Sequence, residues 1–401
     1  MMILLLAGLI LLIVLERRLF RTLWDRGLTA SVSFSDLSVR EGEKTILKEE
    51  IINAKGLPVP ALELRLVLDK SLKIEGELAH NSIISDQLYE RDLFALAGRQ
   101  KIVRSIPVAV TKRGHYRIPS LDMIGYGFFY TDPQYRTYDQ RAELYVFPKS
   151  VDTSRIHTVM RSLSGMMQAR RRLYPDPFEF SGIREYQNSD PMNTINWKAT
   201  ARAGKMLVNQ FDSTTDIRLT VLLDMNDPNI IRQGRLIEES VRIASSLGSA
   251  LSDAGMEFDF VSNGTGIAAA TRASSFRPPT GTDNQEEAAV ISDVSDAIRT
   301  QLHVKPGSGG AFFLDRTLAS IEAGTSLYSA CECFRALEVS DTSAGLCVII
   351  SKNAAPAVEE IDRLSCAKKL PVLWIVPCRP DDAPLSAPRN SSVSLLRWET
   401  L

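Results

Sequence analysis

A run rich in charged and aromatic side chains lies between Phe178 and Phe211 and reads FEFSGIREYQNSDPMNTINWKATARAGKMLVNQF. Arginine side chains can hold a carboxylate or a phosphate through two parallel hydrogen bonds, and acidic side chains in the same run can accept such bonds. The run could therefore clamp an acidic ligand, or its charges could pair with one another. Its candidate residues are Arg184, Glu185, Tyr186, Asp190, Trp197, Lys198 and Arg202.

Three interpretations of this run are open: a buried ionic and aromatic plug between domains, a surface that docks a partner, and a catalytic site. Buried charges are normally paired, which favours the plug. A hydrolase-like enzyme would have to use Arg184, Asp190 and Lys198, yet the run holds no histidine and no nucleophile with a base. We therefore expect no enzymatic activity.

The backbone expected around these side chains is short and rich in turns. Asn188-Ser189-Asp190-Pro191 has strong turn chemistry, because Asn and Asp bond their own backbone and proline presets φ. Residues 192–203 predict a short helix or an irregular turn, and residues 205–211 predict a strand.

A second set of candidates follows predicted strands in the C-terminal half, where strands and helices alternate. Strands are expected at 217–223, 256–261, 266–271, 346–350, 371–376 and 393–398, and helices at 231–254, 285–302, 313–321, 327–337 and 358–367. Such alternation predicts a mostly parallel, doubly wound sheet with helices on both faces, which binds ligands beyond the carboxyl ends of its strands. The loops that begin at Asp224, Ala323 and Ser351 meet that condition.

The N-terminal third predicts a membrane helix followed by a β-sandwich. Residues 1–15 are almost wholly apolar, and extension to Trp24 would cover a bilayer core about 30 Å thick. A signal peptide fits less well, because the basic residues follow the apolar run. By the positive-inside rule we expect a single-pass protein with the bulk of the chain in the cytoplasm. Leu62, Leu64, Leu66 and Leu68 alternate with other residues, which is typical of a half-buried strand.

Composition limits the remaining function classes. The 401 residues suit two or three domains, and the formal net charge of −1 gives no sign of nucleic-acid binding. The five cysteines lack the spacing of a disulfide framework or a zinc site, which favours a reducing compartment. We expect four parts: an anchor over 1–27, the β-sandwich over 28–150, a basic helical connector with the charged run over 151–215, and the α/β domain over 216–401.

The charged run resembles the motif of the domain-of-unknown-function 58 family, which is approximately EF-x-G-x-R-x-Y-x-x-G-D-x-R-x-I-x-W-x-x-x-A-R-x-x-x-L-x-V. The matching residues are Glu179, Phe180, Gly182, Arg184, Tyr186, Asp190, Ile195, Trp197, Lys198, Ala201, Arg202, Leu207 and Val208. Ser189, Asn193 and Asn196 depart from the family's Gly, Arg and Asp. The resemblance implies an immunoglobulin-like sandwich before the motif, and a MoxR-type AAA+ ATPase as partner.

The α/β part resembles a von Willebrand factor type A domain with a degenerate metal site. That family binds a cation with D-x-S-x-S, a distant Thr and a later Asp. Asp224 and Thr325 match, whereas Asn226 and Pro228 replace the serines and Lys352 replaces the last Asp. Divalent cations need oxygen ligands and negative charge, so we expect no cofactor and only a weak case for Mg²⁺. We hypothesise that Lys352 takes the place of the cation and pairs with Asp224.

Together these features predict a non-catalytic, membrane-tethered adaptor that works with the ATPase in assembly or maturation of protein complexes. Membrane lipid would contact the N-terminal helix. The alternatives are the hydrolase-like enzyme described above and an extracytoplasmic sensor or adhesion protein, which would require the opposite membrane orientation.

Overall fold

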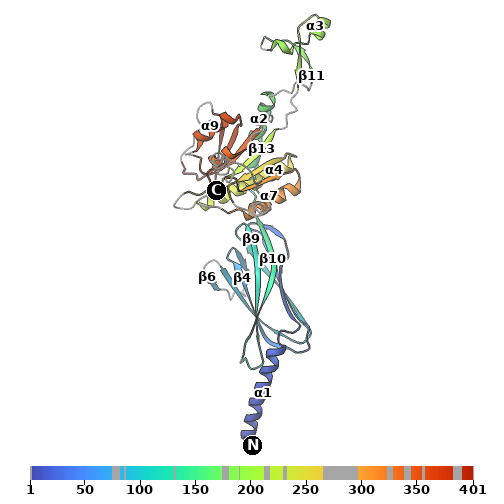
Figure 1. The fold of residues 1–401 in the computed structure, drawn as a ribbon, viewed down its shortest axis with the longest axis vertical. Coiled ribbons are helices and arrows are strands. Elements are labelled where there is room, and N and C mark those ends of the chain that lie inside the picture. The colour runs from blue at the N-terminus through green and yellow to red at the C-terminus, as the bar shows by residue number, and fades with distance from the viewer. Residues whose placement is uncertain are drawn as a thin grey trace, which may run out of the picture. The chain divides into compact units, whose positions relative to one another are not determined.

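The chain forms two compact units, Met1–Lys149 and Ser150–Leu401, whose elements are labelled in Figure 1. The computed structural model describes residues 2–74, 82–84, 87–130, 132–173, 180–188, 190–211, 217–228, 233–264, 297–322, 328–337, 345–354, 357–382 and 391–400. Each unit has its own core and is described by itself.

The N-terminal unit begins with the helix α1, Met2–Leu23. Its apolar side chains from Leu4 to Leu19 are largely exposed, and Trp24, directly after the helix, is buried in the core of the β-strands that follow. Among the helices that the structure describes, none is both long enough and apolar enough to cross a membrane.

The remainder of this unit is a pair of β-sheets around one core. The first sheet has the order β1-β3-β8-β5 and the second β2-β10-β9-β4-β7-β6. All neighbours are antiparallel except β10 and β2. The strands are β1 Leu28–Phe34, β2 Ser38–Arg40, β3 Lys44–Asn53, β4 Val59–Asp69, β5 Leu72–Ile74, β6 Ser82–Ile84, β7 Gln87–Leu96, β8 Gln100–Val110, β9 Gly114–Tyr126 and β10 Gln134–Phe147.

Alternating side chains place this core between the sheets. Leu62, Leu64, Leu66 and Leu68 of β4 are all buried, as the period of two predicts. On β3 the inward positions include Leu47 and Ile51, and the charged Glu49 occupies the inward position between them. The predicted two-layer β-module is therefore present, with one buried carboxylate in its inner row.

The C-terminal unit is built on a six-stranded sheet with the order β15-β14-β13-β16-β17-β18. Numbered along the chain this is 3-2-1-4-5-6, the order of a doubly wound sheet. All neighbours are parallel except β14 and β15. The strands are β13 Arg218–Leu223, β14 Phe258–Ser262, β15 Thr300–Val304, β16 Gly345–Ile350, β17 Val372–Cys378 and β18 Val393–Glu399.

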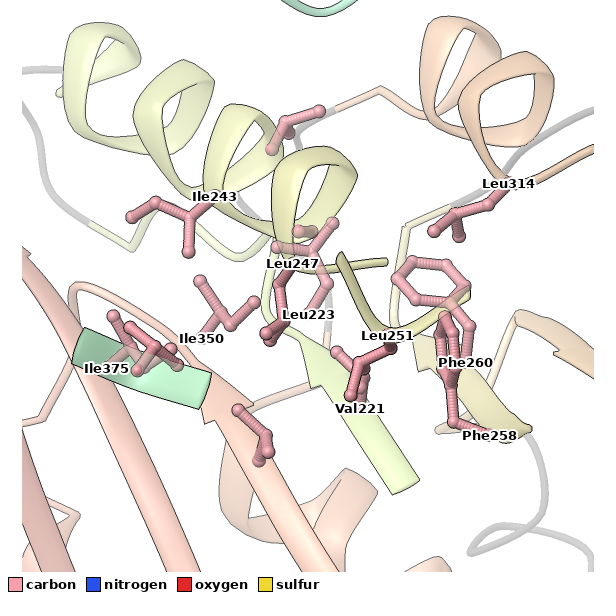
Figure 2. Packing of buried hydrophobic residues seen from close by; sticks show 14 of the residues in the cluster. Val221, Leu223, Ile243, Leu247, Leu251, Phe258, Phe260, Leu314, Ile350 and Ile375 are labelled. Carbon is pink, nitrogen blue, oxygen red and sulfur yellow. The ribbon is translucent and has the colours of Figure 1, made fainter. Parts of the chain in front are cut away.

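Helices cover both faces of this sheet, because neighbouring residues on each strand enter different cores. Val221 joins the core with α2 Thr153–Leu173, α4 Gly234–Asp253 and α7 Ser308–Ser320. Leu222 joins the core with α8 Ala330–Ala336 and α9 Val358–Lys368. Figure 2 shows the first core, with Leu247 and Leu251 of α4 over the sheet and Leu314 of α7 beside Phe258 and Phe260.

The helix α2 was expected to belong to a separate connector, but it is part of this core. Its Ile156, Val159 and Leu163 are buried in the cluster that includes α4. Arg155 Nη2 donates to the carbonyl of Glu399 over 2.8 Å, and its guanidinium lies 3.8 Å from the ring centroid of Trp398. The helix is thereby joined to β18, the edge strand of the sheet.

Two of the elements predicted for this unit fall between residues 266 and 302. The helix expected over residues 285–302 is wrong at its C-terminal end, because Thr300–Val304 forms β15 and pairs antiparallel with β14. The rest of that helix and the strand expected at 266–271 lie outside the described residues. The remaining predicted strands and helices are present within a few residues of their expected ends.

Between α2 and β13 lies a small hairpin, which we call the signature hairpin, residues 180–211. It consists of β11 Phe180–Glu185, the short 3-10 helix η1 Met192–Thr194, the helix α3 Trp197–Ala203 and β12 Leu207–Phe211. β11 and β12 pair antiparallel, from Glu185 opposite Leu207 to Phe180 opposite Phe211.

Candidate functional site

The signature hairpin is held by a minimal core and by caps on its helix. Ile195 bridges to Val208, and both side chains are buried. Asn196 caps α3, because its Oδ1 accepts a hydrogen bond from the Ala199 N–H at 2.9 Å. Gly204 ends the helix at φ 68°, a conformation that glycine adopts without strain. Asn196 thus performs the capping that an Asp at this position would perform.

Arg184 and Asp190 form a bidentate ion pair across the turn of the hairpin. Arg184 Nη1 and Nη2 each donate to one Asp190 oxygen at 2.6 Å. Asp190 also accepts a hydrogen bond from the Gln187 N–H at 2.8 Å. These donors, led by Arg184, lower the pKa of Asp190, and Asp190 raises the pKa of Arg184. Of the two predicted uses of these charges, the structure adopts internal pairing.

The other predicted residues of the hairpin are not gathered into one cluster. Glu185 pairs with Lys205, which lowers the pKa of Glu185, and the Tyr186 N–H donates to the Met206 carbonyl at 3.0 Å. Trp197, Lys198 and Arg202 are carried by α3 and are exposed.

Exposed apolar side chains are unusually frequent on this hairpin. Trp197 is 65% exposed and Met192 64% exposed, so the prediction of a buried aromatic plug is wrong. We call the set the apolar display of the hairpin; it consists of Phe180, Ile183, Met192, Trp197 and Met206. Single exposed apolar residues are ordinary, whereas five of them in one short segment make the hairpin a candidate interaction surface.

The second candidate site lies beyond the carboxyl ends of β13 and β16, where the strand order reverses. Asp224 follows β13, and Ser351, Lys352 and Asn353 follow β16. Asn263 follows the neighbouring strand β14. In doubly wound sheets this reversal point is where ligands bind. We call this group the strand-end cluster.

Asp224 is the centre of the strand-end cluster. Its Oδ1 accepts hydrogen bonds from the Asn226 N–H at 3.0 Å and from Asn263 Nδ2 at 2.7 Å. Its Oδ2 accepts from Ser351 Oγ at 2.6 Å and from Asn353 Nδ2 at 3.1 Å. The buried carboxylate is thus satisfied by four donors from the loops after three strands.

Lys352 pairs with Asp227, which corrects the hypothesis that it pairs with Asp224. Lys352 Nζ lies 2.7 Å from Asp227 Oδ1, and the two side chains are only 3% and 5% exposed. Asp227 Oδ2 accepts the Gln233 N–H at 2.8 Å, which extends the pair to the segment before α4. The lysine is therefore a buried structural cation at this edge of the sheet.

The residues of this cluster do not suit a divalent cation. Such a cation needs several free oxygen ligands and net negative charge, whereas four donors occupy the Asp224 carboxylate and Lys352 neutralises Asp227. Asn226, which replaces the first serine of the metal motif, contributes its backbone N–H and carbonyl to the cluster. Thr325 lies outside the described residues. Within the described ranges, no group of three or more His, Cys, Asp or Glu could hold a metal.

The cysteines near the cluster are poor nucleophiles. All five are free thiols, and four are buried. Burial, the largest cause, raises the pKa of Cys331 and of Cys333 to about 12, so both remain protonated near neutral pH.

Sequence reasoning missed Asn263 and Gln233 and did not assign Asp227 its partner. Asn263 lies two residues beyond the predicted second strand, and a polar residue at that place was the signal that could have found it. Gln233 gave no such signal, because its role depends on a backbone N–H and on the distance to Lys352.

Comparison with known proteins places both sites in one family. Residues 182–373 match the family model described as protein of unknown function DUF58. This part of the chain belongs to the DUF58 family. The DUF58 region contains the strand-end cluster and the signature hairpin from Gly182 onward, so Asp224, Asp227, Lys352 and all the motif residues except Glu179 and Phe180 lie within it. No curated protein matches the chain.

Several solved structures are similar to about a third of the chain. One is a CARDB domain from Pyrococcus furiosus, with 14% identity over 30% of this chain and 93% of that one, at a TM-score of 0.19. Another is a non-cellulosomal cohesin from Archaeoglobus fulgidus, with 13% identity over 32% of this chain and 96% of that one, at a TM-score of 0.21.

Proposed function

We propose that the chain is a non-catalytic, membrane-tethered adaptor whose signature hairpin docks a MoxR-type AAA+ ATPase during assembly or maturation of protein complexes. The observation that carries this proposal is the apolar display on a hairpin fixed by the Arg184–Asp190 pair. Exposed Trp and Met side chains on a rigid support are typical of residues that dominate binding energy at protein interfaces.

The internal pairing of charges supports docking rather than catalysis. A hydrolase would need Arg184 and Asp190 to act on a substrate, but each already satisfies the other through two short hydrogen bonds. The charged groups of the strand-end cluster are likewise paired internally, since donors surround Asp224 and Lys352 neutralises Asp227. These arrangements favour a structural use of both groups.

We further propose that the α/β unit is a von Willebrand type A domain that has lost its metal. The 3-2-1-4-5-6 order, the antiparallel β15 and the position of Asp224 after the first strand support this assignment. The exposed apolar residues of α1 support a membrane tether, with Arg17, Arg18 and Arg21 at its cytoplasmic side.

The test is a crosslinking capture from native membranes with a C-terminally tagged chain, eluted with and without ATP and identified by mass spectrometry. We expect a MoxR-type ATPase whose recovery depends on nucleotide. Trp197→Ala should reduce that recovery strongly, because truncation of a central interface Trp often costs at least about 2 kcal/mol, more than tenfold in affinity.

The matched control is Phe313→Ala, which removes another exposed aromatic ring, 57% exposed on α7, in the same unit. This variant should capture the ATPase as the unchanged chain does. Equal loss of ATPase recovery in both variants would contradict docking through the hairpin. Unchanged recovery by the Trp197→Ala variant would contradict it as well. Absence of any AAA+ ATPase would contradict the partner itself.

A further inference from the structure

The junction between α1 and the β-module is a fixed structure within the N-terminal unit. Trp24, only 5% exposed, anchors the end of the helix in the core. Lys55, from the loop between β3 and β4, donates through Nζ to the carbonyl of Leu23 at 2.9 Å and to that of Trp24. These carbonyls end the helix, so the ammonium group acts as its C-terminal cap.

A cavity of about 350 Å³ lies at this junction and is almost wholly apolar. One wall comes from α1, including Leu15 and Leu19, and the other from the loops that carry Leu57, Pro58 and Phe128. Pockets that bind small molecules have volumes of roughly 300–1,000 Å³, apolar walls and a few polar groups. The only cationic side chain in the wall is that of Lys55.

The wall formed by Phe128 is held in place by polar contacts with α1. Glu16 Oε1 accepts a hydrogen bond from the Phe128 N–H at 3.0 Å. Arg17 Nε donates to Asp132 Oδ2 at 3.1 Å on the same loop region. A Cβ on Gly127 would lie 2.4 Å from Glu16 Oε1, so a larger residue there would displace this carboxylate from its contact with Phe128. The cavity is therefore preformed.

The surroundings of the cavity match the interface of a bilayer. Phe128 is 63% exposed and Tyr130 58% exposed, and both belong to the same loop. Aromatic side chains concentrate at the level of lipid headgroups. Arg18 and Arg21 are exposed on the same helix, and cations near a bilayer surface attract phosphate groups. The ammonium of Lys55 has three hydrogens, of which two are used by the helix carbonyls.

We propose that this cavity binds one acyl chain of a membrane phospholipid, with the lipid phosphate at Lys55. The assignment rests on the membrane tether in the proposed function and adds a specific lipid site to it. The apolar walls surround the hydrocarbon, and the Lys55 ammonium donates its remaining hydrogen to the phosphate. A lipid held there would fix the β-module against the bilayer surface through the same residues that join it to α1.

The experiment uses the full chain with phosphatidylcholine–phosphatidylglycerol vesicles that contain a phospholipid bearing a diazirine on one acyl chain. Flotation with the vesicles measures tethering, and irradiation followed by peptide mapping measures lipid contact. We expect labels at Leu57, Pro58 and Phe128. Leu19→Trp fills the cavity and should lower these labels about tenfold, the factor for losing the burial of roughly two methylene groups.

Leu11→Trp is the matched control, because Leu11 is exposed on α1 but does not line the cavity. It should leave both flotation and labelling unchanged. Labelling that Leu19→Trp does not alter, or that a free diazirine fatty acid produces while the phospholipid does not, would overturn the lipid site and leave tethering intact. A chain that fails to float with the vesicles would overturn the tether and this site together.

Discussion

Two acid–base pairs of the DUF58 region differ in burial. Lys352 and Asp227 are 3% and 5% exposed at the carboxyl end of the parallel sheet, whereas Arg184 and Asp190 are 39% and 11% exposed on the signature hairpin. The first pair joins the loops after β13 and β16. The second closes a turn beside which Trp197 and Met192 remain exposed.

The comparison shows that one kind of contact can have two roles. A buried pair contributes little net stability when it forms, but removal of one partner leaves an uncompensated charge in the interior. A pair at the surface is screened by water and salt, so its main effect is on local geometry. We therefore expect Lys352 to matter for folding of the sheet and Arg184 to matter for the shape of the hairpin.

The largest effect is expected for Lys352→Met. It leaves the Asp227 carboxylate buried without its cation, and such losses cost about 3–5 kcal/mol in the free energy of unfolding. Chemical denaturation of the variant measures this cost. The double variant Lys352→Met, Asp227→Leu should recover most of the stability, because it removes both charges. A double variant no more stable than the single one would show that the pair itself is not the cause.

A smaller effect is expected from a buried carboxylate of the β-module that accepts no hydrogen bond from the described residues. Glu49 is 1% exposed, neither of its oxygens accepts a hydrogen bond from any described residue, and Arg104 Nη1 is 3.6 Å away. Burial chiefly, with the charge of Asp92, raises the pKa of Glu49 from 4.5 to about 7, against the opposing effect of Arg104. The fold therefore favours the protonated acid.

The stability contributed by protonated Glu49 is present below about pH 4.5 and is lost as the pH rises through about 7. The expected loss is about 3 kcal/mol in the free energy of unfolding between those limits. Denaturation across this pH range measures it, with Glu49→Gln as the control, since the amide cannot ionise. If both chains show the same dependence on pH, Glu49 is not the titrating group.

The smallest effect on stability is expected for Arg184→Met. The variant should melt close to the unchanged chain, because the pair is only partly buried and is screened by solvent. Hydrogen exchange at the amides of Gln187 and Asp190 should be faster, because the carboxylate that holds this turn is released. Arg202→Met, an exposed change on α3, should leave this exchange unaltered. Slow exchange in the Arg184 variant would show that the turn does not need the pair.

Strands and helices with a strong apolar periodicity could be predicted from the sequence. Which charged side chains pair with one another could not. Leu62 to Leu68 and the strand before Asp224 follow from repeating apolar patterns. β15 was missed because the run TQLHV lacks a continuous apolar pattern and pairs at the edge of the sheet. Glu49 looked like a surface residue by type, although it shares the inward parity of Leu47 and Ile51.

The strand-end cluster illustrates the same limit at atomic scale. The order of strands predicts that the loops after β13 and β16 meet. Whether Lys352 reaches Asp224 or Asp227 depends on differences of a few ångströms in loop geometry, which spacing along the chain does not specify. The sequence could not predict that Trp197 is exposed either, because the same motif residues are compatible with a buried plug and with an exposed surface.

The contact between α2 and β18 joins two segments of the C-terminal unit that are synthesised at different times. Arg155 and Glu399 are 244 positions apart in the chain, yet they meet at one edge of the sheet. At about 5–20 residues per second, roughly 12 to 50 seconds separate their translation. Once made, β17 has β16 on one side, but its other neighbour β18 and the core residue Trp398 are absent until the end of that interval. The nascent unit must therefore wait, incompletely closed, until residue 399 has left the ribosome.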